Sequence, residues 1–193
     1  MIARVHSATV VGMQVLAVVV EVDIAKKGFP QLKIVGLPGK SVEEAKERVR
    51  TALVNANYDI PARRIIVNLA PADVPKQSSR FDVPIAVGIL AAQRIVPREL
   101  LRDSLFIGEI SLNGEVNAVN SVLPIIDFAQ KHGYKRIFVP FNNCSEAAFV
   151  HGDIAIYGMQ SLAEIIKFSQ GIVQLSPVDT AQLEVRVRKT NQQ

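Results

Sequence analysis

Pro75-Lys76-Gln77-Ser78-Ser79-Arg80-Phe81-Asp82 decides the fold, because this stretch marks the point where a loop enters a helix. Asp82 can cap a helix over Val83 to Gln93, and Pro84 would then stand in the first turn, where a missing backbone N–H costs little. Upstream, Arg63 to Leu69 has an Ile-Ile-Val centre that is typical of a buried strand. The stretch therefore connects a predicted strand to a predicted helix.

A second stretch downstream, Gly108-Glu109-Ile110-Ser111-Leu112-Asn113-Gly114-Glu115-Val116, predicts a hairpin. Its Asn113-Gly114 pair is the strongest short hairpin signal in the chain. The flanking strands are expected over Leu105 to Ile110 and over Glu115 to Val119. The remaining C-terminal elements are predicted helices over 121–132, 145–150 and 162–168, and predicted strands over 136–139 and 154–157.

The N-terminal part of the chain predicts three strands followed by an amphipathic helix. Arg4 to Asp23 is rich in Val and Ala and is broken at Gly12, so it predicts two strands joined by a tight turn. Val18-Val19-Val20 predicts burial on both faces of the second strand, and Gln31 to Val35 is the third strand. From Ser41 the apolar residues share one helical face: Val42, Ala45, Val49, Ala52, Leu53 and Ala56.

The order of these elements predicts an α/β fold. A chain of 193 residues with 49% hydrophobic content can bury one substantial core, so we expect one domain over residues 1–174. Residues 175–193 turn polar and charged, and they are interpreted as a linker or tail. Leu183, Val185 and Val187 alternate weakly within this tail and could add an edge strand.

Composition narrows the class of protein. The lone Cys144 has no partner for an intramolecular disulfide, and the three histidines lie far apart, without metal-ligand spacing. We therefore expect a reduced, cytoplasmic protein without a metal site. No apolar run approaches the length of a membrane span, and the N-terminus lacks the layout of a signal peptide. The formal charge of +4 permits nucleic-acid binding without requiring it.

Gly39-Lys40-Ser41 follows a strand and opens a helix, which is the setting of a phosphate-binding loop. The full motif needs a glycine five positions before Gly39, and Ile34 stands there, so the match fails. A capping box, in which Ser41 accepts from the amide of Glu44 and Glu44 reaches back, is the favoured interpretation.

Arg48, Arg50, Arg63 and Arg64 form the densest basic grouping in the sequence. Arg63 and Arg64 point to opposite faces of a strand, so at most one of them joins a patch with the helix arginines. A solvated face and a nucleic-acid contact both remain open. Cys144 has His151 as its nearest histidine in sequence, but nothing else supports a nucleophilic pair, so a buried or idle thiol is favoured.

Several blocks in order carry a family resemblance: residues 2–7, 20–23, 34–38, 61–65, 68–73 and 80–86, the last reading Arg80-Phe81-Asp82-Val83-Pro84-Ile85-Ala86. The chain resembles the N-terminal domain of the ComM/YifB-type magnesium-chelatase-like proteins, a branch of the AAA+ ATPases. The N-terminal region of that family is similar to the Lon protease domain. The resemblance implies a ribosomal protein S5 domain 2-like, Lon-protease-like α/β sandwich.

Lon proteases carry a nucleophilic serine in a Pro-Lys-Asp-Gly-Pro-Ser-Ala-Gly frame and a lysine after a Gly-Glu-x-x-Leu-x-Gly block. On this sequence the serine position is Arg80 and the lysine position is Leu123, 43 residues later. Neither side chain can serve the serine–lysine chemistry, so the resemblance implies a degenerate protease site without catalytic residues. Arg80 is expected to contact an anion or to pair with an acidic neighbour. Phe81 is expected in the core or at an interface.

The resemblance implies a non-catalytic domain that supports ring assembly of a hexameric DNA branch-migration helicase, acting in natural transformation and DNA recombination. The expected partners are further copies of the chain, and DNA as a second partner. ATP and Mg²⁺ would bind an ATPase module absent from this chain, which needs no cofactor of its own. The candidate nucleic-acid or interface residues are Arg48, Arg50, Arg63, Arg64, Arg80 and Phe81. Two alternatives stay open: a Lon-like peptidase with a displaced nucleophile, Ser78 or Ser79, and a pure protein–protein interaction module.

Overall fold

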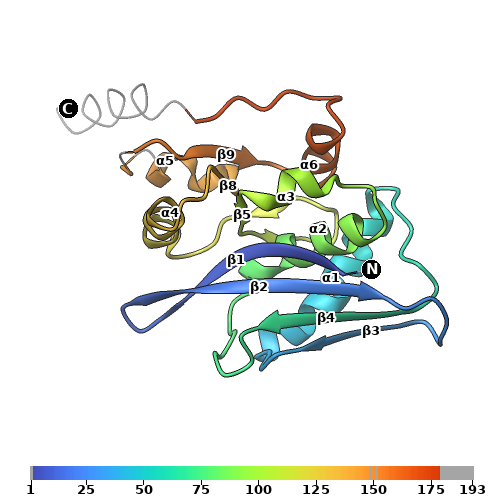
Figure 1. The fold of residues 1–193 in the computed structure, drawn as a ribbon. Helices are drawn as coiled ribbons and strands as arrows, with labels where there is room; N and C mark the ends of the chain where they lie inside the picture. Colours follow the sequence, from blue (N-terminus) through green and yellow to red (C-terminus); the bar gives the residue numbers. More distant parts are fainter. Residues whose placement is uncertain (1, 148, 151, 179–193) are drawn as a thin grey trace.

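The computed structural model describes residues 2–147, 149–150 and 152–178 (Figure 1). In this part of the chain seven strands form one sheet in the order β3-β4-β2-β1-β5-β8-β9. They are β1 (Ala3–Val11), β2 (Gln14–Ile24), β3 (Gln31–Val35), β4 (Arg64–Ala70), β5 (Ser104–Phe106), β8 (Arg136–Pro140) and β9 (Ala155–Met159). Within the described sheet β2 is the one strand that runs antiparallel to its neighbours, β1 and β4.

Helices cover the sheet on both faces. They are α1 (Lys40–Asn55), α2 (Asp82–Ala92), α3 (Arg98–Arg102), α4 (Val122–Lys131), α5 (Cys144–Ala147) and α6 (Leu162–Ser169). Short 3₁₀ turns precede α2 at Ser79–Phe81 and α5 at Phe141–Asn143. The predicted α/β class is confirmed: a mostly parallel sheet is flanked by helices.

The predicted hairpin at Asn113-Gly114 is also confirmed. β6 (Glu109–Ile110) pairs antiparallel with β7 (Val116–Asn117) in a small separate sheet. The amide of Gly114 donates to the Ser111 carbonyl, and the amide of Ser111 donates to the Glu115 carbonyl, which closes the turn. The strand predicted over 105–110 is divided in the structure, because β5 joins the large sheet and β6 joins the small one.

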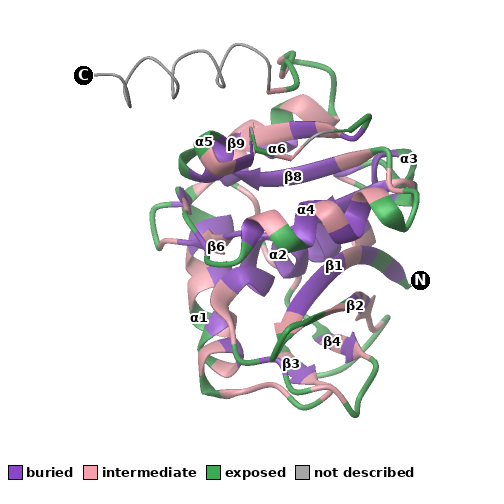
Figure 2. Ribbon diagram, turned by 90° about the vertical axis from the view of Figure 1, so that its left-hand side faces the viewer, coloured by how far each residue is buried: buried purple, intermediate pink, exposed green. Residues whose placement is uncertain are grey.

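The core has two parts, one on each face of the large sheet. One part joins α1, α2 and α6 to residues such as Val5, Val20 and Phe106. The other joins α4 and α5 to residues such as Leu105 and Ile137. β8 is buried along most of its length (Figure 2) because both of its faces are covered.

β2 departs from its prediction. Val18 and Val20 are fully buried, but Val19 between them is half-buried, so the strand is not buried on both faces. The second face of this part of the sheet carries polar side chains instead of a helix. Glu21 accepts from Arg4 Nε at 2.9 Å and from Asn68 Nδ2 at 3.0 Å, which links three adjacent strands.

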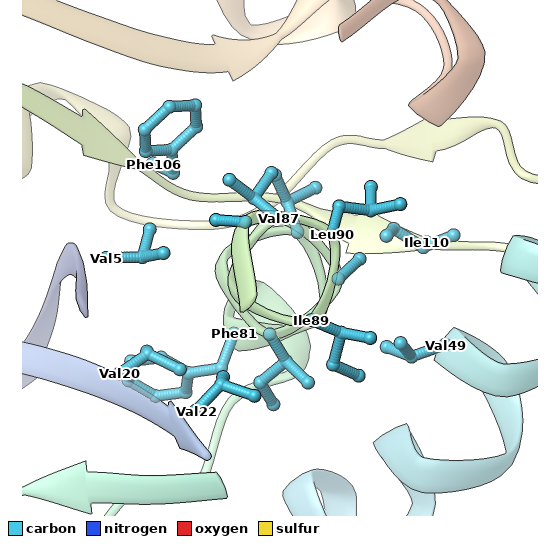
Figure 3. Close-up of a cluster of buried hydrophobic side chains, with 14 of the residues drawn as sticks. Val5, Val20, Val22, Val49, Phe81, Val87, Ile89, Leu90, Phe106 and Ile110 are labelled. Carbon is cyan, nitrogen blue, oxygen red and sulfur yellow. The ribbon is translucent and has the colours of Figure 1, made fainter. Parts of the chain in front are cut away.

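α2 lies at the centre of the molecule. Every residue from Asp82 to Ala91 is buried, and side chains from β1, β2, α1 and β6 surround the helix (Figure 3). Gly88 allows this close approach, because a Cβ atom there would lie 2.6 Å from Cγ2 of Val22. The helix therefore has no solvent-exposed face from Asp82 to Ala91 and is packed on all sides.

Two predicted helix caps are wrong. The N-cap residue of α1 is Gly39, without a side-chain hydrogen bond, so Ser41 and Glu44 form no capping box. The Gly39 amide instead donates to the Lys76 carbonyl at 2.7 Å. Asp82 is the first residue of α2 and not its cap, because its carboxylate is engaged by another helix. Tertiary contacts replaced local capping in both cases.

The C-terminal predictions are only partly covered by the structure. The amide of Val178 donates to the Ile156 carbonyl at 2.7 Å, beside β9. The edge strand predicted from Leu183 to Val187 lies outside the described residues, and the domain boundary at residue 174 stays a prediction. None of the helices in the described part of the chain has the length and apolar character needed to cross a bilayer.

Candidate functional site

The last residue of the Pro75–Asp82 stretch forms an ion pair in which the carboxylate is fully buried and the arginine side chain is 22% exposed. Arg48 of α1 donates from Nε to Oδ2 of Asp82 at 2.7 Å and from Nη2 to Oδ1 at 3.0 Å, so the contact is bidentate. The Arg48 Nη2 atom also donates to the Ser41 carbonyl at 2.9 Å. The Asp82 carboxylate accepts a further bond from the Ile110 amide at 3.2 Å. This network ties α1, α2 and β6 together.

The position of Asp82 makes this pair structural. Asp82 is fully buried, and this burial raises the pKa of its carboxyl, although the Arg48 guanidinium and the Ile110 amide oppose the shift. Pairing with Asp82 raises the pKa of Arg48 in turn. Arg48 was a candidate for nucleic-acid contact, but its guanidinium is committed inside the chain. Arg50 of the same helix, with Arg63 and Arg64, remains exposed.

Arg80, at the serine position of the protease frame, is 6% exposed. Its Nε atom donates to Oγ of Ser78 at 3.0 Å, and Nη1 is buried without a hydrogen-bond partner among the described residues. Burial lowers the pKa of the guanidinium, and no described carboxylate acts on it to oppose that shift. The predicted ion pair with an acidic neighbour is therefore not found in the described part of the chain.

A cavity of about 300 Å³ adjoins Arg80. One wall is the end of the β1–β2 hairpin, and the other is the Pro75–Asp82 stretch. The residues that line it are Thr9, Val10, Val11, Gly12, Pro75, Gln77, Ser78 and Arg80. The cavity thus combines apolar and neutral polar walls with one buried cation.

The neighbours of Arg80 have separate roles. Phe81 is fully buried and lies beside Val20 and Val22 (Figure 3), so of its two predicted locations the core is the one observed in this chain. Ser79 Oγ donates to the Glu109 carboxylate, which also accepts from Nδ2 of Asn117 at 3.3 Å. Leu123 lies half-buried in the first turn of α4.

Lys76 holds the stretch in place. Its side chain is fully buried, and its Nζ atom donates to the carbonyl oxygens of Gly36, at 3.0 Å, and Pro71. The Lys76 amide donates to the Leu37 carbonyl at 3.2 Å, so the stretch is joined to the β3–α1 connection by main chain and side chain. Burial lowers the pKa of this ammonium group. Lys76 therefore ties the stretch to the main chain at Gly36 and Pro71, because its ammonium group donates to both carbonyl oxygens.

The fold also assembles a basic pocket that the sequence analysis missed. Arg4 and His6 of β1 meet Arg98 and Arg102 of α3 around a pocket of about 430 Å³, which Ile2 and Leu101 complete. Arg98 Nη2 donates to the Ile2 carbonyl at 2.9 Å, which holds α3 against the start of β1. The spacing of Arg98 and Arg102 by one helical turn was a visible signal, but their proximity to Arg4 required the fold.

Cys144 is expected to resist alkylation in the folded chain. The thiol is 8% exposed, and burial raises its pKa to about 11. At pH 8 the thiolate fraction is then about 100-fold lower than in an unfolded chain, where the thiol has its ordinary pKa. Iodoacetamide labelling followed by mass spectrometry, in buffer and in 6 M guanidinium chloride, measures the difference. Equal rates in the two conditions would contradict an inert thiol.

Comparison with known proteins identifies the family. Residues 20–143 match the family model described as "ChlI: Subunit ChlI of Mg-chelatase". Competence protein ComM of Haemophilus influenzae is 42% identical over 170 residues, which are 88% of this chain and 33% of ComM. YifB of Escherichia coli is 34% identical over 177 residues, or 91% of this chain and 35% of YifB. Lon protease 2 of Bacillus subtilis is 28% identical over 127 residues, or 65% of this chain and 22% of that protease.

The fold and these matches define a magnesium-chelatase-like α/β domain with a Lon-like relative. The chain belongs to the ChlI Mg-chelatase family, in the group that contains ComM and YifB, and corresponds to the N-terminal domain of that group. It spans about a third of the length of ComM and of YifB.

Proposed function

We propose that this chain is the non-catalytic N-terminal domain of a ComM-like hexameric AAA+ helicase that drives DNA branch migration. The observation that carries the proposal is the 42% identity to a competence protein over 88% of the chain. ATP and Mg²⁺ would bind to the ATPase module of the complete protein. The domain would support ring assembly and add a DNA contact.

The absence of peptidase activity in this proposal rests on side-chain chemistry. A guanidinium at position 80 cannot attack a carbonyl, and Leu123 cannot accept a proton. Ser79 donates its hydroxyl hydrogen to a carboxylate, Glu109, rather than to an amine. The chain is therefore expected to leave labelled casein intact. Cleavage that disappears in Ser79→Ala would contradict this part of the proposal and revive a displaced nucleophile.

The basic pocket supports the DNA contact. Arg98 and Arg102 are both exposed and line the pocket, whereas Arg4, which lines it too, is paired with Glu21 at 2.9 Å. Such a cluster suits phosphate groups, since binding releases counterions from DNA. The scattered positions Arg50, Arg63 and Arg64 are exposed as well and provide an independent comparison.

Arg98→Gln/Arg102→Gln is expected to weaken binding of the chain to single-stranded and branched DNA. A plot of log affinity against log salt concentration has a negative slope. If each arginine contacts one phosphate, the magnitude of this slope is smaller by about two in the double variant. Fluorescence anisotropy at several salt concentrations measures the slope. Arg63→Gln/Arg64→Gln is the matched control, with the same charge change at the start of β4.

Two results would count against the DNA contact. No binding at low salt would remove it from this domain. A larger loss of DNA affinity in the Arg63→Gln/Arg64→Gln control than in the pocket variant would assign the DNA contact to the surface that carries Arg63 and Arg64. The assembly role is tested separately, by sedimentation velocity of a polypeptide that joins this chain to its ATPase module. Deletion of residues 1–174 is expected to lower the hexamer fraction.

A further inference from the structure

The cavity beside Arg80 is lined by a buried cation that has no charge partner among the described residues. Arg80 carries a full positive charge, and 94% of its surface is removed from solvent, since 6% remains exposed. Its Nη1 atom has no hydrogen-bond partner among the described residues. The described residues also supply no salt bridge to this guanidinium, although Asp82, two positions later, has one to Arg48.

An unpaired buried cation is costly. Buried charges in proteins are normally paired or hydrogen-bonded on every side, because removal from water is otherwise uncompensated. Ser78 accounts for one donor of Arg80 by accepting from Nε. The remaining guanidinium donors are therefore available to a group from outside the described chain, and an anion would satisfy them best.

The cavity walls limit which anion fits. Arg80 is the one cation among the lining residues described, and the others are neutral, such as Thr9, or apolar, such as Val10 and Val11. A nucleic-acid backbone is usually followed by several cations, which this cavity lacks. A single guanidinium next to apolar walls matches a single planar carboxylate, which can accept two parallel hydrogen bonds.

The size and surroundings of the cavity favour a carboxylate carried by a peptide. A volume of about 300 Å³ is at the small end for ligand pockets and accommodates an acidic side chain. The adjoining hairpin end exposes Val11 and, fully, Met13, which can receive apolar residues next to the acidic one. We propose that Arg80 and the β1–β2 hairpin form a binding site for an acidic side chain of a peptide or protein partner. This site goes beyond the proposed function.

The test uses the 193-residue chain labelled with ¹⁵N and two small probes. Ac-Glu-NH₂ carries the carboxylate, and Ac-Gln-NH₂ is its neutral match, both titrated at constant ionic strength. We expect Ac-Glu-NH₂ to shift the Arg80 Nε–H signal and the amide signals of Thr9 and Gly12 in a saturable way. The same concentrations of Ac-Gln-NH₂ are expected to leave these signals in place.

Variants assign the effect to the guanidinium. Arg80→Met keeps an unbranched apolar stem but removes the guanidinium and its charge, and it is expected to reduce the affinity for Ac-Glu-NH₂ at least tenfold. Arg50→Met, at an exposed arginine of α1, is the matched control and keeps the affinity. Without any probe, Arg80→Met is expected to raise the Tm by a few degrees, since it removes a buried charge that no described residue pairs. Arg80→Gln provides a second neutral variant if Arg80→Met fails to fold.

Other outcomes would overturn the proposal. Equal shifts with the two probes would show that the carboxylate is not recognised. Saturation by inorganic phosphate or by a thymidine decamer at lower concentration than by Ac-Glu-NH₂ would assign the cavity to phosphate. A lower Tm for Arg80→Met would show that the chain already compensates the charge. None of these results affects the DNA contact of Arg98 and Arg102, which is measured on separate variants.

Discussion

Asp82→Ala is expected to lower the free energy of unfolding by about 3–5 kcal/mol, because it leaves the Arg48 guanidinium without its bidentate partner. The substitution also removes the acceptor for the Ile110 amide, which is buried in the folded chain. Three elements lose their common anchor in a single change. Urea denaturation followed by circular dichroism measures the loss.

Glu44→Gln is the control for the Asp82 prediction. Glu44 lies 3.9 Å from Nη1 of the same arginine, but its side chain is 56% exposed. Pairs of this kind contribute about 0–1 kcal/mol, since water screens them. A loss below about 1 kcal/mol for Asp82→Ala, or equal losses for the two variants, would show that the buried pair does not anchor the helices.

Phe81→Ala has the second large expected effect, a loss of about 3–5 kcal/mol in the free energy of unfolding. Phe81 is fully buried next to the β2 side chains Val20 and Val22 (Figure 3), and truncation leaves a void between the helix entry and the sheet. Phe29→Ala removes the same ring at a position that is 92% exposed, so it is the matched control.

The same urea titration separates the core role of Phe81 from an interface role. A core residue changes the stability of the isolated chain, and Phe29→Ala should stay within about 0.5 kcal/mol of the parent. If Phe81→Ala leaves the stability unchanged and alters only self-association, the ring belongs to an interface and the core assignment fails.

Local patterns predicted most of the fold. β3 was predicted at its observed bounds, because Pro30 and Gly36 stand directly before and after it. Asn113-Gly114 identified the hairpin for a similar reason. α3 was not predicted, since its five residues are too few to show a helical period. The two cap predictions were wrong because Gly39 and Asp82 bond to partners distant in sequence. Gly39 donates to the Lys76 carbonyl, and Asp82 pairs with Arg48.

The candidate sites depended more on the fold. The resemblance to Lon proteases predicted that Arg80 stands at the nucleophile position, but it could not show that the side chain is buried beside a cavity. The basic pocket combines the first strand with α3, far apart in the chain, so no window of sequence contains it. From the sequence, Arg48 could equally be a DNA-binding residue or a structural one. Its ion pair with Asp82, which only the structure shows, identifies the structural role.

The strand order has a consequence for the time course of folding. β1 pairs with β2 across a tight turn, whereas its other neighbour is β5, with His6 opposite Leu105. Pairing of β1 with β5 closes a long loop, which contains β2, β3, β4 and the helices between them. This closure costs conformational entropy that the β1–β2 hairpin does not incur. We expect the pairing of β1 with β5 to form late, after the β3-β4-β2-β1 unit and the β5-β8-β9 unit have each formed.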